Sequence, residues 1–269
     1  MTSGMTSGLT LLRAAHPGPA LAVTLLAGML GLAVGLGPAE VALVVAAVGT
    51  GQLTIGWTND LTDAARDRAV GRTDKPLATG EVDERTVRGF DAAARVLTVV
   101  LSLLTGLVSG LVQLLVVASG LAYNLGLKST AWSWAPYAVA FGALPAFVSL
   151  VDDPDALPPW WLVVAGSLLG VGAHLVNVLP DLADDEATGV RGLPHRLGAR
   201  RASVLAAAVL VGATVVVVLG STIDPVLAAA ALTLVGALAV VALVTRGRTP
   251  FRAAIAMALV DVAMLVVAR

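Results

Sequence analysis

The sequence predicts an all-α membrane protein with nine transmembrane helices, and its composition, segment lengths and an internal repeat all support this. Of the 269 residues, 57% are hydrophobic and 13% are charged, whereas soluble domains carry about 25% charged residues. A membrane-spanning helix needs a run of about 20 apolar residues. Runs near this length lie at 18–37, 40–58, 88–110, 112–127, 131–150, 160–179, 202–220, 225–244 and 250–268. Glycine, proline and short polar clusters separate them, including Gly37-Pro38 and Ser109-Gly110.

Composition also excludes several classes of function. The chain has no cysteine, which excludes a disulfide framework, a thiolate nucleophile and a cysteine-ligated metal centre. Its net charge is -1, and it has no long basic run. We therefore expect no nucleic acid partner. The partners that remain are the lipid bilayer and small or lipid molecules.

Six polar and helix-breaking residues recur at a constant offset of 118 residues. Asn59, Asp63, Asp67, Gly71, Pro76 and Gly80 correspond to Asn177, Asp181, Asp185, Gly189, Pro194 and Gly198. A fixed period in residues of this kind indicates duplicated structural units. The repeat predicts two helix-loop units, around 40–128 and 160–245, within a single domain of residues 1–269. Both copies are parallel, because each span must run toward the same side of the membrane.

Basic residues are segregated to one side of the predicted spans. Fifteen of the 17 lie near Arg13, in the 66–88 loop, at Lys128, or in the 191–201 and 246–252 loops. Nine spans place all of these on one face, which should be cytoplasmic because Lys and Arg accumulate there. The expected protein is a multi-pass cell-membrane protein. Its N-terminus and both aspartate-rich repeats face the cytoplasm, and its C-terminus lies on the opposite side.

The repeated aspartates have the chemistry of a metal site. Residues four apart share a helical face, so each Asn-x3-Asp-x3-Asp pattern gathers its oxygens, and Asp60 and Asp184 each add one more. Carboxylates that converge at the end of an apolar span need a positive partner, and oxygen ligands without His or Cys favour Mg²⁺. The predicted ligands of two Mg²⁺ ions are Asp60, Asp63, Asp67, Asp181, Asp184 and Asp185.

Basic residues accompany both acidic motifs and suggest a diphosphate as the ligand. Arg66, Arg68, Arg72 and Lys75 follow the first motif, and Arg191, Arg196, Arg200 and Arg201 follow the second. Lys128, with Tyr123 and Asn124 just before it, reaches the same face. Cations beside a leaving group stabilise the negative charge that builds on it. One Mg²⁺ in each repeat could then hold a diphosphate from both sides.

The stretch Asn59-Asp60-Leu61-Thr62-Asp63-Ala64-Ala65-Arg66-Asp67 resembles the first aspartate-rich motif of the UbiA superfamily of intramembrane prenyltransferases. Asn177-x3-Asp181-x3-Asp185, followed by Gly189 and Leu193-Pro194-x-Arg196-Leu197-Gly198, resembles the second. Tyr123-Asn124-x3-Lys128 is similar to a further family pattern. The resemblance implies a nine-helix bundle around a central cavity, which ionises an allylic prenyl diphosphate with Mg²⁺ and transfers the prenyl group to an acceptor.

The resemblance also implies roles for individual residues. Asp60, Asp63 and Asp67 would hold one Mg²⁺, and Asp181 and Asp185 the other. The implied catalytic residues are Asp63, Asp181, Lys128 and Tyr123. The implied substrate-binding residues are Asn59, Arg72, Lys75, Asn124, Lys128, Asn177, Arg191 and His174. The sequence departs from the family pattern at Leu179-Pro180, where many members have a basic residue, and Pro180 also removes a backbone donor.

Several polar residues allow more than one interpretation. His174, three residues before Asn177, could line the cavity and accept a proton from an acceptor, or simply bond a neighbouring helix. Asp91 and Arg95 are four apart and should form an ion pair. Asp261 stands alone in the last span, with Arg95 as its one suggested partner. His16 could border the acceptor pocket.

Three functions compete on this evidence. The first is prenyl transfer to a small or lipid acceptor. The second is a terpene cyclase or lyase, in which the same prenyl cation closes on itself or loses a proton. The third is a transporter, which fits less well because transporter sites tend to lie at the bilayer midplane and these aspartates lie at a helix end. The acceptor, the prenyl chain length and the oligomeric state are not encoded in any pattern that we recognise.

Overall fold

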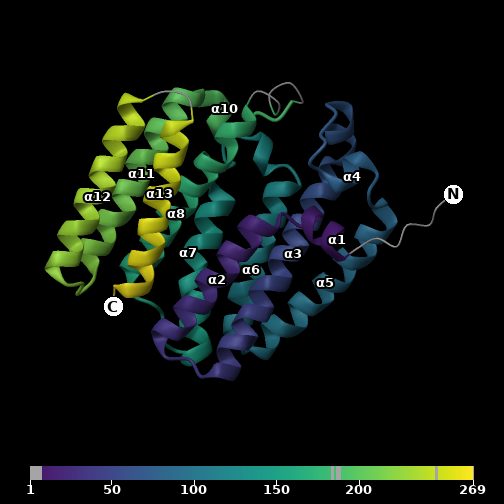
Figure 1. Ribbon diagram of the computed structural model, residues 1–269. Coiled ribbons are helices and arrows are strands. Elements are labelled where there is room, and N and C mark those ends of the chain that lie inside the picture. Colours follow the sequence, from purple (N-terminus) through teal and green to yellow (C-terminus); the bar gives the residue numbers. More distant parts are fainter. Residues whose placement is uncertain (1–7, 183–184, 186–188, 246–247, 269) are drawn as a thin grey trace.

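A computed structural model describes residues 8–182, 185, 189–245 and 248–268, and every regular element among them is a helix. Figure 1 shows the helices running roughly side by side. Their bounds are α1 Gly8–Ala14, α2 Pro17–Val34, α3 Pro38–Ala69, α4 Pro76–Thr79, α5 Glu84–Leu104, α6 Leu107–Asn124, η1 Leu127–Ser129, α7 Ala135–Asp152, α8 Trp160–Val178, η2 Leu179–Asp181, α10 Leu193–Leu197, α11 Ala199–Gly220, α12 Pro225–Val244 and α13 Thr249–Val267.

The predicted all-α membrane fold is confirmed, and the count of nine spans holds approximately. Nine of the helices formed by the described residues have 18 or more residues, and eight of these are long and apolar enough to cross a membrane. The ninth, α5, has 21 residues but carries Glu84, Arg85, Arg88, Asp91 and Arg95 in its first three turns. This charged half belongs at the membrane surface, and only the second half of α5 has the composition of a span.

Two boundaries differ from the sequence-based expectation. Helix α3 does not end near residue 58 but continues to Ala69, because the acidic motif keeps a helical pattern beyond the apolar run. The break between α5 and α6 lies at Thr105-Gly106 and not at Ser109-Gly110. Gly106 has a φ of 126°, which a residue with a side chain rarely adopts. Gly110 instead lies inside α6, where an added Cβ would sit 2.5 Å from the Ser102 carbonyl oxygen.

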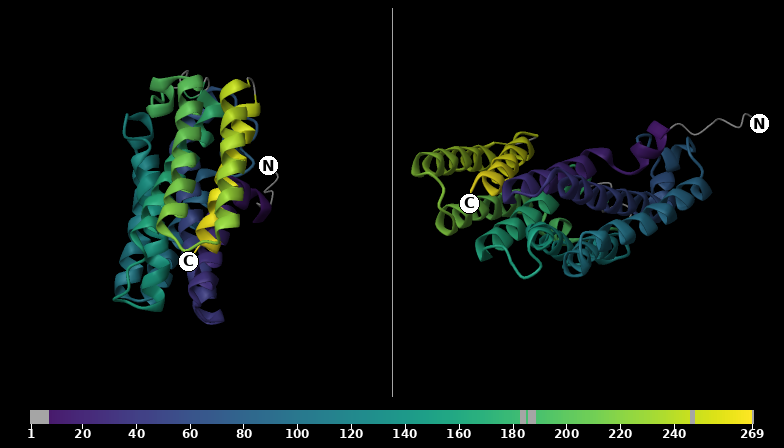
Figure 2. Two further views of the ribbon diagram at one scale, coloured as in Figure 1. Left: turned by 90° about the vertical axis from the view of Figure 1, so that its left-hand side faces the viewer. Right: turned by 90° about the horizontal axis from the view of Figure 1, so that it is seen from below.

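The long helices form a closed ring of contacts. Consecutive helices pack against each other from α2 through α3, α5, α6, α7, α8 and α11, and α13 joins α8 and α11 back to α2. Seen along the helix axes, the ring is elongated, with α12 at one end and α5 at the other (Figure 2). The largest buried cluster lies between α8, α11, α12 and α13, around Leu169, Leu210 and Met257. A second cluster around Phe147 joins α2, α3 and α7.

The outside of the ring is covered by aliphatic side chains that no other helix buries. On α12, for example, Val226, Val240 and Val244 are 75%, 57% and 73% exposed. A soluble protein rarely leaves so much aliphatic surface uncovered, whereas hydrocarbon covers it at no cost. Together with the eight apolar helices, this surface identifies a multi-pass membrane protein.

Two short helices, α4 and α10, lie at the same end of the bundle, and the C-terminal end of α13 lies at the other (Figure 1). Each short helix follows one acidic motif and begins at or next to a proline of the repeat, Pro76 or Pro194. Each is followed by a repeat glycine with positive φ, 78° at Gly80 and 76° at Gly198. The two units therefore share a positive φ at this glycine but not its ψ angle, which is 12° at Gly80 and 160° at Gly198.

Candidate active site at the motif end of the bundle

The first acidic motif occupies the last turns of α3, and its carboxylates are buried. Asp60, Asp63 and Asp67 are 1%, 7% and 8% exposed. The helix stays continuous from Pro38 to Ala69, so residues four apart stack on one face, as predicted. Buried carboxylates are costly unless they are paired, and each partner in this cluster is therefore informative.

Asp63 is the most densely contacted of the three. It accepts a hydrogen bond from Lys128 Nζ and pairs with Arg66, whose guanidinium nitrogen lies 2.7 Å from Asp63 Oδ2. Asn59 Nδ2 donates to Asp63 Oδ2 at 3.2 Å and to Asn124 Oδ1 at 3.1 Å. Asn124 in turn donates to the backbone oxygen of Ile55 at 2.8 Å. These bonds tie the end of α6 and the η1 turn to α3.

Asp60 is held by residues from two other segments. Lys75 Nζ donates to Asp60 Oδ1 at 2.6 Å, and His16 Nε2 lies 3.1 Å from the same oxygen and 2.7 Å from Lys75 Nζ. His16 has a φ of 53°, a backbone conformation that is uncommon for a residue other than glycine. Asp60 Oδ2 is buried and has no hydrogen-bond partner among the described residues. No described residue therefore uses the hydrogen-bonding capacity of this oxygen.

The second motif is less regular than the first, which corrects the prediction of one continuous helical face. Helix α8 ends at Val178 and continues as the 3₁₀ turn η2, Leu179–Asp181, because Pro180 cannot supply the next helical donor. The side chain of Asp181 is 47% exposed, and that of Asp185 is 28% exposed and 3.5 Å from His195 Nε2. The predicted ligand Asp184 lies outside the described residues.

The two motifs face each other across the end of the bundle. The Arg72 guanidinium lies 3.7 Å from Asp181 Oδ1, so a loop that follows the first motif reaches the second. Lys128 lies close enough to both Asp63 and Asp185 to interact electrostatically with each. Arg66 likewise acts on Asp185 as well as on Asp63. The carboxylates thus surround a shared set of cations, as the diphosphate hypothesis requires.

Burial and pairing shift the pKa values of the groups at this end of the bundle. Burial lowers the pKa of Lys128, and the Asp63 carboxylate partly opposes this. Burial raises the pKa of the Asp185 carboxyl, against the influence of His195. A two-pronged hydrogen bond from Arg72, at 2.8 Å to each oxygen, lowers the pKa of Asp74 to about 2 and raises that of the guanidinium. Arg72 therefore stays charged while it stands beside Asp181.

An aromatic group lies next to the carboxylates. The Tyr123 ring packs edge-on against Tyr137, with centroids 5.3 Å apart, and both rings contact the His174 imidazole. Tyr137 also hydrogen-bonds the side chain of Asn177. His174 is fully buried, and its Nε2 lies 3.0 Å from Ser133 Oγ. Ser133 Oγ accepts from the backbone nitrogen of Leu193 at 2.9 Å, which fastens the second loop to this group.

The model of the UbiA prenyltransferase family matches residues 20–265. The chain belongs to the UbiA prenyltransferase family. This result confirms the resemblance drawn from the motifs.

Individual UbiA relatives agree with this assignment. The bacteriochlorophyll synthase 33 kDa chain of Cereibacter sphaeroides is 29% identical over 182 residues, which cover 63% of this chain and 57% of that one. A UbiA homologue from Archaeoglobus fulgidus bound to GPP and Mg²⁺ superposes with a TM-score of 0.70 at 17% identity, over 95% of this chain and 98% of its own. An apo UbiA homologue from Aeropyrum pernix K1 gives 0.72 at 20% identity, over 96% and 97%. At these identities, the two structures show the shared fold.

The side chains at the motif end fit the metal that such a site implies. The donors are carboxylate and amide oxygens, which suit Mg²⁺, and Asp60 Oδ2 is a buried oxygen without a described partner. Among the described residues, no three acidic or histidine side chains come together as a complete metal cage. An incomplete cage is expected for Mg²⁺, which is typically held by one or two carboxylates together with substrate phosphates and water.

Not every predicted residue joins this site. Arg191 is exposed, and within the described ranges its guanidinium has no ion-pair partner, although its backbone oxygen accepts from Arg196. Arg95 pairs with Asp91 at 2.9 Å, as predicted. The suggested pairing of Asp261 with Arg95 is wrong. Asp261 instead accepts a hydrogen bond of 2.6 Å from Thr214 inside the packing of α11 against α13.

Three contributors did not stand out in the sequence. In the sequence, Arg66 is one of several basic residues that follow the first motif, but in the structure it pairs directly with Asp63. His195 lies beside Asp185, and Ser133 connects His174 to the second loop. His195 could have been noticed because histidine is rare in this chain. The chain has three histidines, and all three lie at this end of the bundle, beside Asp60, Ser133 and Asp185. A single serine carries no comparable signal.

Proposed function

We propose that this protein is a Mg²⁺-dependent prenyltransferase that ionises an allylic prenyl diphosphate between its two acidic motifs and transfers the prenyl group to a small or lipid acceptor. The observation that carries the proposal is the approach of the motifs, with Arg72 reaching from the first loop to Asp181. Family membership supports the reaction type, and a UbiA homologue bound to GPP and Mg²⁺ supports the substrate class.

In this proposal, the acidic and amide side chains form the two halves of a diphosphate site. Asp60, Asp63 and Asp67 belong to one half, and Asp181 and Asp185, with Asp184 from outside the described residues, belong to the other. Mg²⁺ would shield the diphosphate charge and stabilise that charge as it builds on the leaving group. Asn59 and Asn124 fix the direction of the Asp63 carboxylate by donating and accepting along one chain of hydrogen bonds.

The cations of the site would change partners when substrate binds. Lys75 and Lys128 now hold carboxylate oxygens that a metal would take, so their ammonium groups can turn to the phosphate oxygens. Arg72 would reach the phosphate oxygens from the first loop, and Arg191, which is exposed in this structure, would turn toward them from the second. Cations placed in advance around the leaving group lower the barrier because they need no reorganisation during bond breaking.

The chemical step needs no covalent link to the protein. The bond between the prenyl carbon and the diphosphate oxygen breaks, and its electron pair leaves with the diphosphate. The allylic cation that remains is attacked by a nucleophilic atom of the acceptor, which then loses a proton. Tyr123 and Tyr137 present aromatic faces beside the site and would stabilise the cation while they exclude water. His174 would act in this pocket on the acceptor side.

The buried His174 also favours a second candidate, a terpene cyclase or lyase. Its Nδ1 is buried without a hydrogen-bond partner among the described residues, so it could take a proton from a prenyl cation that meets no acceptor. Ionisation is the same in both reactions, and the two differ only in what happens to the cation.

One experiment separates transfer from cyclisation. Purified protein is incubated with Mg²⁺ and a panel of allylic diphosphates, with and without a membrane lipid extract that supplies acceptors, and both pyrophosphate and organic products are measured. Transfer predicts pyrophosphate release and a prenylated product only when acceptor is present. Hydrocarbon products without acceptor would favour the cyclase instead.

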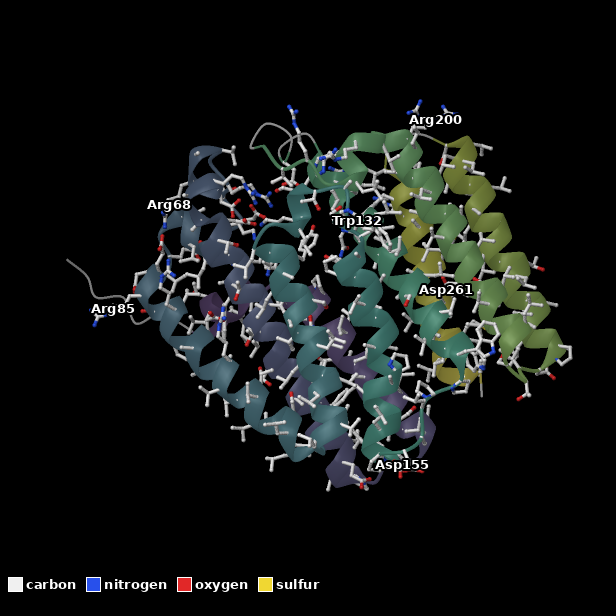
Figure 3. All side chains as sticks on the ribbon, turned by 180° about the vertical axis from the view of Figure 1, so that it is seen from behind. Arg68, Arg85, Trp132, Asp155, Arg200 and Asp261 are labelled. Atoms are coloured by element: carbon white, nitrogen blue, oxygen red, sulfur yellow. The ribbon has the colours of Figure 1, made fainter. Side chains whose placement is uncertain are left out.

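The same assay tests the assigned site. We expect Asp63→Asn and Asp181→Asn to lose about 100-fold or more in rate, the magnitude typical of a lost charge-stabilising group. Asp155→Asn removes an exposed acid at the opposite end of the bundle (Figure 3) and serves as the control. Wild-type protein that cleaves no allylic diphosphate would contradict the proposal and revive a transport function.

We also propose that the motif end faces the cytoplasm. Figure 3 shows Arg68 and Arg200 near one end of the bundle and Asp155 at the other. Lys and Arg accumulate in cytoplasmic loops, so the end with the basic residues is expected to face the cytoplasm. The N-terminus would then be cytoplasmic, and the C-terminus would lie on the opposite side.

A further inference from the structure

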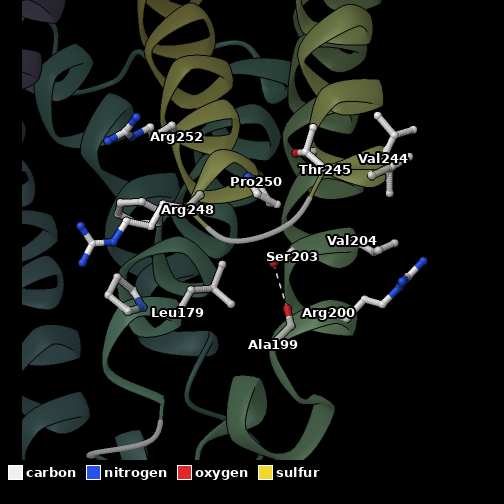
Figure 4. Close-up of a pocket in the computed structure, with 14 residues that line it drawn as sticks. Leu179, Ala199, Arg200, Ser203, Val204, Val244, Thr245, Arg248, Pro250 and Arg252 are labelled. Carbon is white, nitrogen blue, oxygen red and sulfur yellow. Dashed lines mark hydrogen bonds between the residues drawn. The ribbon is translucent and has the colours of Figure 1, made fainter.

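A hollow of about 960 Å³ lies beside the diphosphate site at the same end of the bundle. Its walls come from η2, the beginning of α11, the end of α12 and the beginning of α13 (Figure 4). Among the described residues, none that we assign to the diphosphate site lines it. Leu179 and Pro180 form part of one wall, immediately before Asp181 in the chain.

Three arginines flank this hollow, and none of its lining residues in the described ranges is acidic. Arg248 and Arg252 extend on one side, and Arg200 extends on the other (Figure 4). None of the three guanidiniums makes an ion pair or hydrogen bond within the described part of the chain, in contrast to Arg66, Arg72 and their neighbours. Three uncompensated positive charges around one depression create a potential that attracts an anion.

The remaining lining residues are aliphatic and uncovered. Val204, Leu243 and Val244 line the hollow and are 42%, 47% and 73% exposed. Exposed aliphatic groups at the end of a transmembrane helix face hydrocarbon, whereas arginines at the same level face headgroups. Ser203 donates to the backbone oxygen of Ala199 at 2.8 Å, so its hydroxyl proton is already engaged within α11 (Figure 4). The hollow therefore combines an anion-attracting rim with an apolar wall.

We propose that this hollow binds the phosphate-bearing headgroup of an anionic lipid from the surrounding leaflet. The guanidiniums donate charge-assisted hydrogen bonds to the phosphate oxygens, and the acyl chains lie against Val204 and Val244. Basic depressions between transmembrane helices on the cytoplasmic side are suited to such headgroups. Since Leu179 and Pro180 are part of the wall, the bound lipid also supports the turn that carries Asp181. The lipid site itself does not depend on the proposed reaction.

The test compares two pairs of charge-neutralising substitutions in the full-length protein. Arg200→Gln with Arg252→Gln removes two cations of the hollow. Arg201→Gln with Arg88→Gln removes two exposed cations that do not line it and gives the same net charge. Purified variants in neutral detergent are titrated with a fluorescent phosphatidylglycerol, with phosphatidylcholine as the uncharged probe. We expect the first pair to weaken phosphatidylglycerol binding by about tenfold or more, which corresponds to about 1.4 kcal/mol, and the second pair to leave it unchanged.

Three results would overturn the proposal. An equal loss of phosphatidylglycerol binding in both pairs would mean that binding depends only on the overall surface charge. No loss in either pair would mean that it binds elsewhere. Displacement of the lipid by inorganic phosphate alone, with equal affinity, would assign the site to a soluble phosphate. If the first pair does not fold, Arg200→Gln against Arg201→Gln repeats the comparison with neighbouring residues on one helix.

Discussion

At the scale of single residues, the site is a set of buried carboxylates held by cations that can change partners. Asp60 is bonded to Lys75, and Asp63 is bonded to Lys128 and Arg66. A buried acid that loses its partner leaves an uncompensated charge, which costs several kcal/mol. The cations therefore hold the carboxylates in place, and under the proposed function the same groups would turn to the diphosphate.

Lys128 gives a prediction for the pH dependence of activity. Burial lowers its pKa, so its ammonium proton is lost at a lower pH than that of an exposed lysine. We expect kcat/KM of the wild type to fall on the alkaline side for this reason. Lys128→Arg, whose guanidinium stays charged, should move the fall to higher pH. Lys128→Met should be about 100-fold slower than the wild type at pH values where Lys128 is charged, and should not show this fall. An unchanged alkaline fall in Lys128→Arg would remove Lys128 from this role.

The sequence could predict the participants of the first motif because helical spacing determines which side chains share a face. Asn59, Asp63 and Asp67 lie on an uninterrupted helix, and the observed bond from Asn59 to Asp63 follows from their separation of four residues. The partners that arrive from elsewhere in the chain could not be predicted this way. Ser133 and His174 form a hydrogen bond although they are 41 residues apart in the sequence, and Thr214 and Asp261 do so at a separation of 47 residues. Only packing brings them together.

At the scale of helices, a proline explains why the two repeats are not equal copies. The first motif continues within α3, whereas Pro180 turns the second into 3₁₀ geometry and leaves Asp181 about half exposed. We infer that the pair arose as duplicated units, because the matched glycines of both loops keep a positive φ. The first motif therefore supplies buried carboxylates on a continuous helix, and the second supplies a more exposed carboxylate on a 3₁₀ turn.

Close packing of α7 against α8 supports the second motif, and one glycine tests it. A Cβ on Gly166 would lie 2.6 Å from the backbone oxygen of Phe141, which is too close for two packed helices. We expect Gly166→Ala to destabilise the protein by about 1–3 kcal/mol, seen as a lower Tm in detergent. Gly236→Ala on α12, where an added Cβ meets nothing within 4 Å, is the control. An equal Tm in both variants would show that the close contact at Gly166 does not contribute to stability.

At the scale of the whole molecule, the ring of helices determines what each end can do. The α13 contact with α2 closes the bundle, and both acidic motifs and both short helices lie at one end (Figure 1). Composition predicted the bundle because eight helices carry long apolar runs. It placed the break between α5 and α6 incorrectly, because hydropathy does not detect a positive φ at Gly106.

The proposed orientation can be measured because the chain has no cysteine. A single introduced cysteine is then the only site for a maleimide reagent. We expect Asp155→Cys to react with a membrane-impermeant maleimide in cells with an intact inner membrane, and Arg201→Cys to react only after that membrane is permeabilised. Labelling of Arg201→Cys before permeabilisation would reverse the orientation.

We propose above all that both acidic motifs bind one diphosphate through divalent metal ions. Replacing Mg²⁺ by Mn²⁺, whose bound ions can be counted and detected, tests this most directly. The protein is loaded with a non-hydrolysable allylic thiolodiphosphate, and the bound Mn²⁺ ions are counted and examined by electron paramagnetic resonance. Our account predicts two ions per chain with a magnetic coupling between them, and the loss of one ion in Asp60→Asn and of the other in Asp181→Asn. A single ion unaffected by Asp181→Asn, or two ions without coupling, would contradict it.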